Sequence, residues 1–92
     1  MLDQEKVKAV REYLQGQFSN GTVEDRYDAS RKSQVFSIQR QGTLYLTAIQ
    51  QAFLDDHGAG DIPAALARFH LVEHLRDLPG QLVLVTKAGL TM

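Results

Sequence analysis

The sequence predicts an α+β fold, in which a four-stranded, mostly antiparallel sheet carries helices packed on one of its faces. Three observations predict it. Apolar residues near the start of the chain recur at helical spacing, two strand-like segments in the middle flank a glycine turn, and a short apolar run near the end follows a helical region. The expected order of elements is α-β-β-β-α(-α-α)-β, and residues 1–92 are expected to form a single domain.

The composition is typical of a globular protein. Hydrophobic residues make up 43% of the chain and charged residues 23%, far from the composition of a disordered segment. With 92 residues, the chain exceeds the size below which disulfides or metals are usually needed for stability. The sequence has no cysteine, no recognisable signal peptide and no apolar run long enough to span a bilayer. We therefore expect a cytoplasmic protein without membrane contact.

The first element is expected to be a helix capped by Asp3, whose carboxylate can accept hydrogen bonds from N–H groups of the first turn. Leu2 and Val7 have the spacing of a hydrophobic staple across this start. The helix can end at Gly16 or, as a firmer stop, at Asn20. One of its faces carries apolar residues that we expect in the core: Val7, Val10, Leu14 and Phe18.

Residues 22–28 alternate weakly and carry several charges, which predicts a short strand at an edge of the sheet. With that strand at an edge, the last strand is expected beside the third one. If the last strand instead lies inside the sheet, the first strand can become central. A connection through helices to a parallel last strand would be right-handed.

The second and third strands, residues 34–39 and 43–48, are predicted to form a hairpin. A three-residue loop with Gly42 in the left-handed region gathers four apolar side chains on one face. A two-residue turn instead places Ile38 opposite Tyr45 and scatters the apolar residues over both faces. Because register follows the hydrophobic pattern, we predict the three-residue loop. The four side chains that it brings together are Phe36, Ile38, Leu44 and Leu46.

Two helical regions are expected after the hairpin. Thr47 and Gln50 have the spacing of a capping box, which predicts a short helix over residues 48–57. Asp61 is expected to cap the second region, with Pro63 in its first turn.

The second helical region, residues 61–78, is expected to be interrupted. Its first apolar set ends at Phe69 and its second set begins at Leu71. On one continuous helix these two sets would point in almost opposite directions. We therefore predict a break or kink near His70, which gives two short helices. The alternative is a single helix that is buried on both sides.

The last strand, residues 81–86, is apolar on both faces. Such strands are usually covered on both sides, whereas helices on one face of the sheet cover only one. One of the two apolar pairs, either Val83 with Val85 or Leu82 with Leu84, therefore lacks an obvious cover within the chain. We predict a homodimer, with Val83 and Val85 as the candidate interface. Helices that wrap both faces are the alternative.

Two clusters could carry chemistry. Asp55, Asp56 and His57 place two carboxylates at the expected end of a helix, where the helix dipole disfavours them, so they are a candidate surface site. Capping of the next segment or pairing with an arginine would also explain them. His70 and His74 have a metal-ligand spacing, which a break at His70 would destroy. We expect neither a metal nor a cofactor.

The sequence contains none of the phosphate-loop, dinucleotide, zinc-protease or nucleophile-elbow motifs, and no catalytic residue is predicted. Its formal net charge of -1 does not favour nucleic-acid binding, so we expect no nucleic-acid partner. The exception is a set of basic residues interleaved with aromatic residues around the hairpins, as in sheets that bind RNA. That set comprises Arg26, Arg31, Lys32, Arg40, Tyr27 and Tyr45.

The sequence resembles several groups of known proteins. The α-β-β-β-α opening resembles double-stranded-RNA-binding domains in topology, although residues 61–65 lack the basic cluster that begins the last helix of that family. The same order resembles the small acidic secretion chaperones of bacteria, which dimerise and hold partner peptides. The segments 53–57, 75–76 and 83–90 are similar to a group of small bacterial proteins of about this length, for which we know of no activity.

Together these observations predict a small, non-enzymatic binding or interaction module, expected to be homodimeric and to act on an unidentified protein partner. The alternatives are an accessory domain that binds nucleic acid and, less favoured, a small metal-dependent protein.

Overall fold

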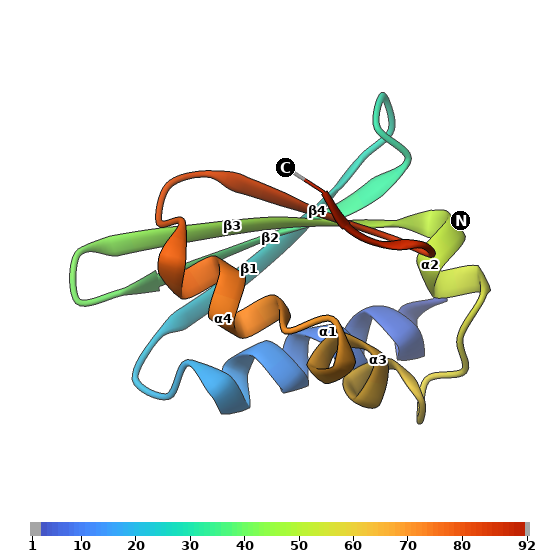
Figure 1. Cartoon of the computed structure of the whole chain (residues 1–92), viewed down its shortest axis with the longest axis horizontal. Coiled ribbons are helices and arrows are strands. Elements are labelled where there is room, and N and C mark those ends of the chain that lie inside the picture. Colours follow the sequence, from blue (N-terminus) through green and yellow to red (C-terminus); the bar gives the residue numbers. More distant parts are fainter. Residues whose placement is uncertain (1–2, 92) are drawn as a thin grey trace.

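The computed structural model describes residues 3–91 and shows one five-stranded mixed sheet in the strand order β1-β2-β3-β4-β5. Helices lie below the sheet as it is drawn in Figure 1. The α+β class is confirmed, and the strand count is five instead of four. In chain order the elements are α1 (Gln4–Gln17), β1 (Thr22–Asp28), β2 (Ser33–Arg40), β3 (Thr43–Gln50), α2 (Gln51–Asp55), α3 (Ile62–Arg68), α4 (Leu71–Asp77), β4 (Leu82–Thr86) and β5 (Gly89–Thr91).

The helix α1 forms as its sequence predicts. The Asp3 carboxylate accepts a hydrogen bond from the Glu5 N–H at 2.9 Å, which satisfies one of the free donors at the helix start. The helix ends at Gln17, and Phe18 follows as its C-cap residue. The predicted staple involves Leu2, which lies outside the described residues. The four residues expected in the core are all buried: Val7, Val10, Leu14 and Phe18.

The strand β1 is an edge strand, as predicted from its charge. One of its charged side chains, Asp25, has a structural partner on the helix side of the sheet. Its carboxylate forms an ion pair with Arg11 of α1 at 2.8 Å and accepts a hydrogen bond from the Gln34 amide at 2.6 Å. The carboxylate therefore links the edge strand to α1 and to the neighbouring strand β2.

The predicted register of the β2–β3 hairpin is wrong. Ile38 lies opposite Tyr45, so the turn has two residues instead of three. Gln41 and Gly42 both have positive φ, of 52° and 79°. This arrangement is that of a type I′ turn, whose twist matches the twist of the strands. The left-handed conformation predicted for Gly42 is confirmed. The hydrophobic pattern predicted the wrong register because the two-residue turn, and not the apolar pattern, determines which residues pair. As a result Leu44 lies on the face away from the helices, where it is 40% exposed.

Two residues with polar atoms take the places on the helix side that the leucines were expected to fill. Tyr45 packs its ring against Phe18, with 5.0 Å between the centroids. Thr47 is fully buried, and its hydroxyl donates a hydrogen bond to the carbonyl of Val83 at 2.8 Å. A buried hydroxyl with a partner is compatible with a core position.

The predicted helix over residues 48–57 is present in a shorter form that begins three residues later. The strand β3 continues to Gln50, and α2 is limited to five residues, Gln51–Asp55. Thr47 therefore lies within a strand, where its hydroxyl binds Val83 and does not cap a helix. The capping-box interpretation of Thr47 and Gln50 is wrong for this reason.

The predicted break at His70 is confirmed. His70 adopts the left-handed conformation with φ of 59°, between α3 and α4. Pro63 lies in the first turn of α3, as expected. Asp61 occupies the N-cap position of that helix, but its side chain makes no capping hydrogen bond.

The last strands show one expected and one unexpected feature. β4 lies beside β3, as predicted for a sheet with β1 at an edge, and it runs parallel to β3. β5 lies beyond the last predicted strand, which ended at residue 86, and was not predicted. Its turn is closed by Thr86, which accepts a hydrogen bond from the Ala88 N–H at 3.1 Å and donates one to the Gly89 carbonyl at 3.0 Å. A three-residue strand is too short to produce a visible sequence pattern.

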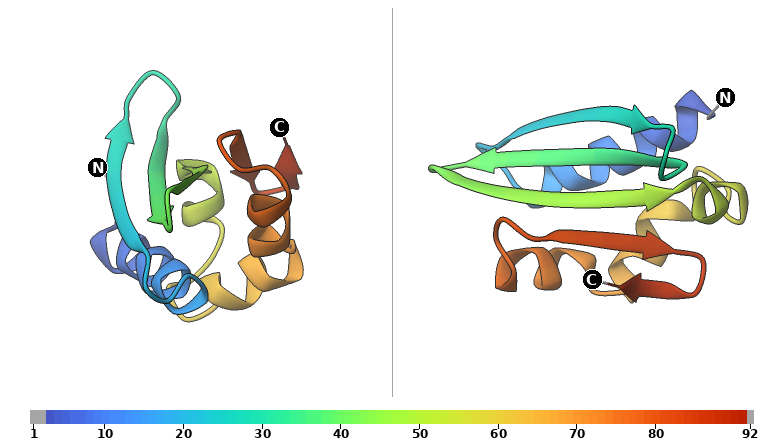
Figure 2. Two further views of the ribbon diagram at one scale, coloured as in Figure 1. Left: turned by 90° about the vertical axis from the view of Figure 1, so that its left-hand side faces the viewer. Right: turned by 90° about the horizontal axis from the view of Figure 1, so that it is seen from above.

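The crossover from β3 to β4 places α2, α3 and α4 on the same side of the sheet as α1 (Figures 1 and 2). As a result Val83 and Val85 are fully buried under the helices, and Leu82 and Leu84 point to the opposite, helix-free face, where they are partly exposed. The two valines are therefore not available to a partner. The assignment of the candidate dimer interface to Val83 and Val85 is wrong, and the uncovered pair is Leu82 and Leu84.

A pair of alanine substitutions in the hairpin tests this register. Phe36→Ala should lower the free energy of unfolding by about 3–5 kcal/mol, because it removes a fully buried ring. Leu44→Ala is the matched control and should cost less than about 1 kcal/mol, because Leu44 lies on the exposed face. Urea denaturation followed by circular dichroism measures both values. A loss above about 2 kcal/mol for Leu44→Ala would restore the three-residue loop.

Candidate functional site

The predicted cluster Asp55, Asp56 and His57 lies at the end of α2, and its members have different surroundings. Asp55 and Asp56 are exposed. The backbone N–H of Asp56 donates to the carbonyl of Ala52 at 3.1 Å, which closes the last turn. The Nδ1 atom of His57 lies 2.9 Å from the carbonyl oxygen of Phe53, and the two rings pack with their centroids 4.4 Å apart. His57 is thus held by the helix end.

Asp55 lines a surface hollow of about 550 Å³ that Asp56 and His57 do not line. This hollow lies between the loop joining β1 to β2 and the start of α2. Tyr27 reaches across it, and its hydroxyl donates a hydrogen bond to the Oε1 atom of Gln51 at 3.2 Å. The hollow offers mixed charges and amide groups, which suit hydrogen bonding to a partner. Its polar and charged lining residues are Tyr27, Arg31, Lys32, Gln50, Gln51 and Asp55.

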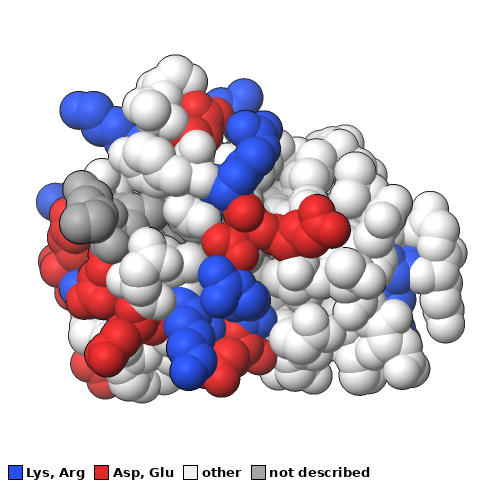
Figure 3. Space-filling view, turned by 180° about the vertical axis from the view of Figure 1, so that it is seen from behind, with Lys and Arg blue, Asp and Glu red and all other residues white. Residues whose placement is uncertain are grey.

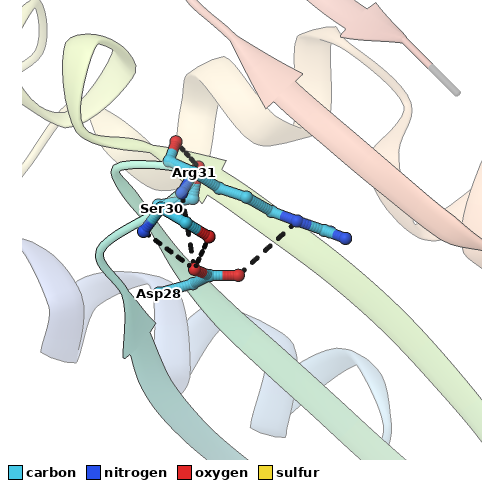
Figure 4. A network of polar contacts seen from close by, with 4 residues as sticks. Asp28, Ser30 and Arg31 are labelled. Carbon is cyan, nitrogen blue, oxygen red and sulfur yellow. Dashed lines mark hydrogen bonds and ion pairs between the residues drawn. The ribbon is translucent and has the colours of Figure 1, made fainter.

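The β1–β2 loop is ordered around Asp28 (Figure 4). The Oδ1 atom of Asp28 accepts hydrogen bonds from the Ser30 hydroxyl at 2.7 Å and from the Ser30 N–H at 3.1 Å. Arg31 lies alongside, with its Nε atom 3.5 Å from the Oδ2 atom of Asp28. The Ser30 hydrogen bond is the largest cause that holds the pKa of Asp28 below its ordinary value. These contacts thereby fix the position of the Arg31 backbone, from which its side chain extends.

The helix-free face of the sheet, which we call the open face, carries the largest group of accessible apolar side chains on the strands. These residues alternate with the core residues of their own strands and are partly exposed. The sequence pattern placed two of them, Leu44 and Leu46, in the core, and the turn type was the signal that would have reassigned them. The apolar residues with accessible side chains on this face are Val35, Leu44, Leu46, Leu82 and Leu84.

Two of the surface hollows of the molecule lie on the open face. The larger, of about 450 Å³, lies over Leu82 and Leu84 and is also bounded by Arg31, Gln50 and Thr91. Arg31 and Gln50 also line the polar hollow beside α2, so the two hollows share a border. The smaller, of about 220 Å³, is bounded by residues of β1, β2 and β3: Glu24, Asp25, Arg26, Val35, Ser37 and Leu46.

The histidines are not arranged as a metal site. His70 takes the left-handed conformation, and its Nδ1 atom lies 2.8 Å from the Oε2 atom of Glu73. This hydrogen bond lowers the pKa of the Glu73 carboxyl. Among residues 3–91, no group of three or more His, Asp or Glu side chains is placed to hold a metal ion.

The basic and aromatic residues considered for RNA binding are divided among different parts of the molecule. Arg31 and Lys32 lie in the β1–β2 loop, Arg40 lies at the far end of β2, and Tyr45 packs into the core against Phe18. Figure 3 shows Lys and Arg side chains interspersed with Asp and Glu over the back of the molecule, without a continuous basic area on that face. Within the described part of the chain, no helix has the length and apolar character needed to cross a membrane.

Comparison with protein-family models, with curated proteins and with solved structures finds no match to this chain. The residues and geometry described above are therefore the basis for assigning a function.

The Asp28 network makes a direct prediction. Ser30→Ala should raise the pKa of Asp28 towards the ordinary value, because it removes the hydroxyl that binds the carboxylate. Carboxyl carbon chemical shifts recorded during an acid titration give this pKa. Ser19→Ala, an exposed serine outside the network, is the control and should leave it unchanged.

The same network affects the acid dependence of stability. A group whose pKa is lower in the folded state stabilises the fold above its unfolded pKa, and this contribution is lost as pH falls through the folded pKa. Ser30→Ala should therefore lose less stability than the unsubstituted protein on acidification below about pH 4. An unchanged Asp28 pKa in this variant would contradict the assigned role of Ser30.

Proposed function

We propose that this protein is a non-enzymatic binding module that uses the open face of its sheet to hold another polypeptide. The observation that carries the proposal is the accessible apolar group on β2, β3 and β4, with all four helices on the opposite side. Burial of a fully exposed apolar side chain is worth about 1.5–3 kcal/mol, and a partner that covers this face gains the share of that value that corresponds to the exposed part of each side chain. Contiguous apolar surface on a soluble protein is characteristic of an interaction site.

The surroundings of the open face support a protein partner over a nucleic acid. Glu24 and Arg26 bring opposite charges to its β1 side. The net charge of -1 gives no general attraction to phosphates. A polypeptide can instead place apolar side chains on Leu82 and Leu84 and polar groups near Arg31. We place this interaction in the cytoplasm, on the ground that the sequence contains no cysteine.

Site-specific photo-crosslinking tests the proposal. A photoreactive amino acid is introduced at Leu46, on the open face, or at Ala67, an exposed position on α3. Each full-length variant is irradiated in an extract of the source cells, and adducts are separated by mass and identified by mass spectrometry. We expect discrete protein adducts from position 46 and only background from position 67, because the partner covers the sheet.

Equal labelling from the two positions would contradict the proposed binding surface. Adducts confined to position 67 would move the interaction to the helical side.

A further inference from the structure

The open face has a self-complementary pattern, and from it we infer that the partner is a second copy of this chain, packed face to face about a twofold axis that runs across the strands. This inference rests on the proposed function, because it assumes that the open face is the binding surface. It adds the identity of the partner and the direction of the axis.

Cross-strand pairing arranges the centre of the open face in two adjacent rows. In the first row, Arg26 pairs with Val35, Val35 with Ala48, and Ala48 with Leu84. We call these four residues the arginine row. It begins with a positive charge on β1 and ends with a large apolar side chain on β4.

The second row lies two residues away along each strand. Glu24 pairs with Ser37, Ser37 with Leu46, and Leu46 with Leu82. We call these four residues the glutamate row. It begins with a negative charge on β1 and also ends with leucine on β4.

A twofold axis between the rows and across the strands would lay the arginine row of one protomer on the glutamate row of its partner. At the β1 side, Arg26 then faces the partner's Glu24, and symmetry provides the reciprocal pair. At the β4 side, Leu84 faces the partner's Leu82. Both contacts are favourable, since the charges are opposite and the leucines are apolar on both sides.

The middle of the rows is complementary in size. Ala48 is the short side chain of the arginine row on β3 and is fully buried beneath its longer neighbours. Leu46 is the long, partly exposed side chain of the glutamate row on the same strand. The same axis places Leu46 above the partner's Ala48, where it rests on the longer side chains of Val35 and Leu84 that flank this alanine. The hollow of about 220 Å³, bounded by members of both rows, leaves room beside this contact.

Sheets that pack face to face align their strands to within about 30°, and a twofold axis across the strands allows this alignment. An axis parallel to the strands would instead lay β1 on β5, bringing Glu24 and Arg26 near a strand that offers them no opposite charge. The charge pattern therefore selects the first axis.

Charge-reversal variants, measured by sedimentation equilibrium, test whether the chain forms this face-to-face dimer. The unsubstituted chain should sediment at low salt with about twice its mass of 10.3 kDa at tens of micromolar. Glu24→Arg or Arg26→Glu alone creates two like-charge contacts in the dimer and should raise its dissociation constant about tenfold. The double variant carrying both changes should recover the original affinity. A mixture of the two single variants should form a heterodimer, because every contact in it again joins opposite charges.

Control variants distinguish this geometry from other modes of dimerisation. Glu12→Arg and Arg68→Glu reverse the same charges at exposed helical positions and should leave the dimer unchanged. Leu84→Asp should abolish the face-to-face dimer. A dimer that survives Leu84→Asp would overturn the inference. It would indicate that the two copies pair through their β1 edges, an arrangement that also brings residue 24 near the partner's residue 26. Circular dichroism checks that Leu84→Asp remains folded, and Leu46→Asp replaces it if it does not.

A monomeric unsubstituted chain, or single reversals without effect on a dimer, would overturn the inferred face-to-face dimer. If position 46 then crosslinks to a different protein, the proposed function stands without the self-association. If no position-specific adduct forms, the proposed function falls as well.

Discussion

The parallel pairing of β3 with β4 is the constraint on which the rest of this structure depends. Parallel neighbours cannot be joined by a tight turn, so the chain must leave β3, cross one face of the sheet and return. It does so with α2, α3 and α4, on the face that α1 already covers. The buried hydrogen bond from Thr47 to the Val83 carbonyl joins the two strands at the centre of this arrangement. All the helical cover therefore lies on one side of the sheet.

The asymmetry of the two faces follows from that crossover. On the covered side Val83 and Val85 are fully buried, and the helices supply the apolar side chains that enclose them. On the open side Leu82 and Leu84, from the same strand, remain partly exposed. One layer of helices thus covers one apolar face of β4 and leaves the second face partly exposed. The topology thereby leads to the proposed interaction without requiring any catalytic group.

Several elements were predictable because their signals were local. The Asp3 cap and the spacing of apolar residues defined α1, and opposed apolar sets located the break at His70. The hairpin register was not predictable from hydrophobicity, because the type I′ turn at Gln41 and Gly42 placed Tyr45 on the core side. Amphipathic residues can occupy either side of a sheet, so an apolar count assigns them poorly.

The candidate site was likewise predictable only in part. The apolar character of both faces of β4 indicated that one pair would be uncovered, but sequence alone could not decide between Val83–Val85 and Leu82–Leu84. That choice depends on which face of the sheet the crossover helices cover and on the register of β4 against β3. A shift of the register by one residue moves each side chain of the strand to the other face.

The central claim, that a second copy covers the open face, is tested most directly by methyl NMR with a soluble paramagnetic agent at low and high protein concentration. We expect the methyl groups of Leu46, Leu82 and Leu84 to be broadened by the agent in dilute protein and protected in concentrated protein. The methyl groups of Leu66 and Leu71, which are buried in the core, should be protected at both concentrations. Equal broadening of the three open-face leucines at both concentrations would contradict the claim.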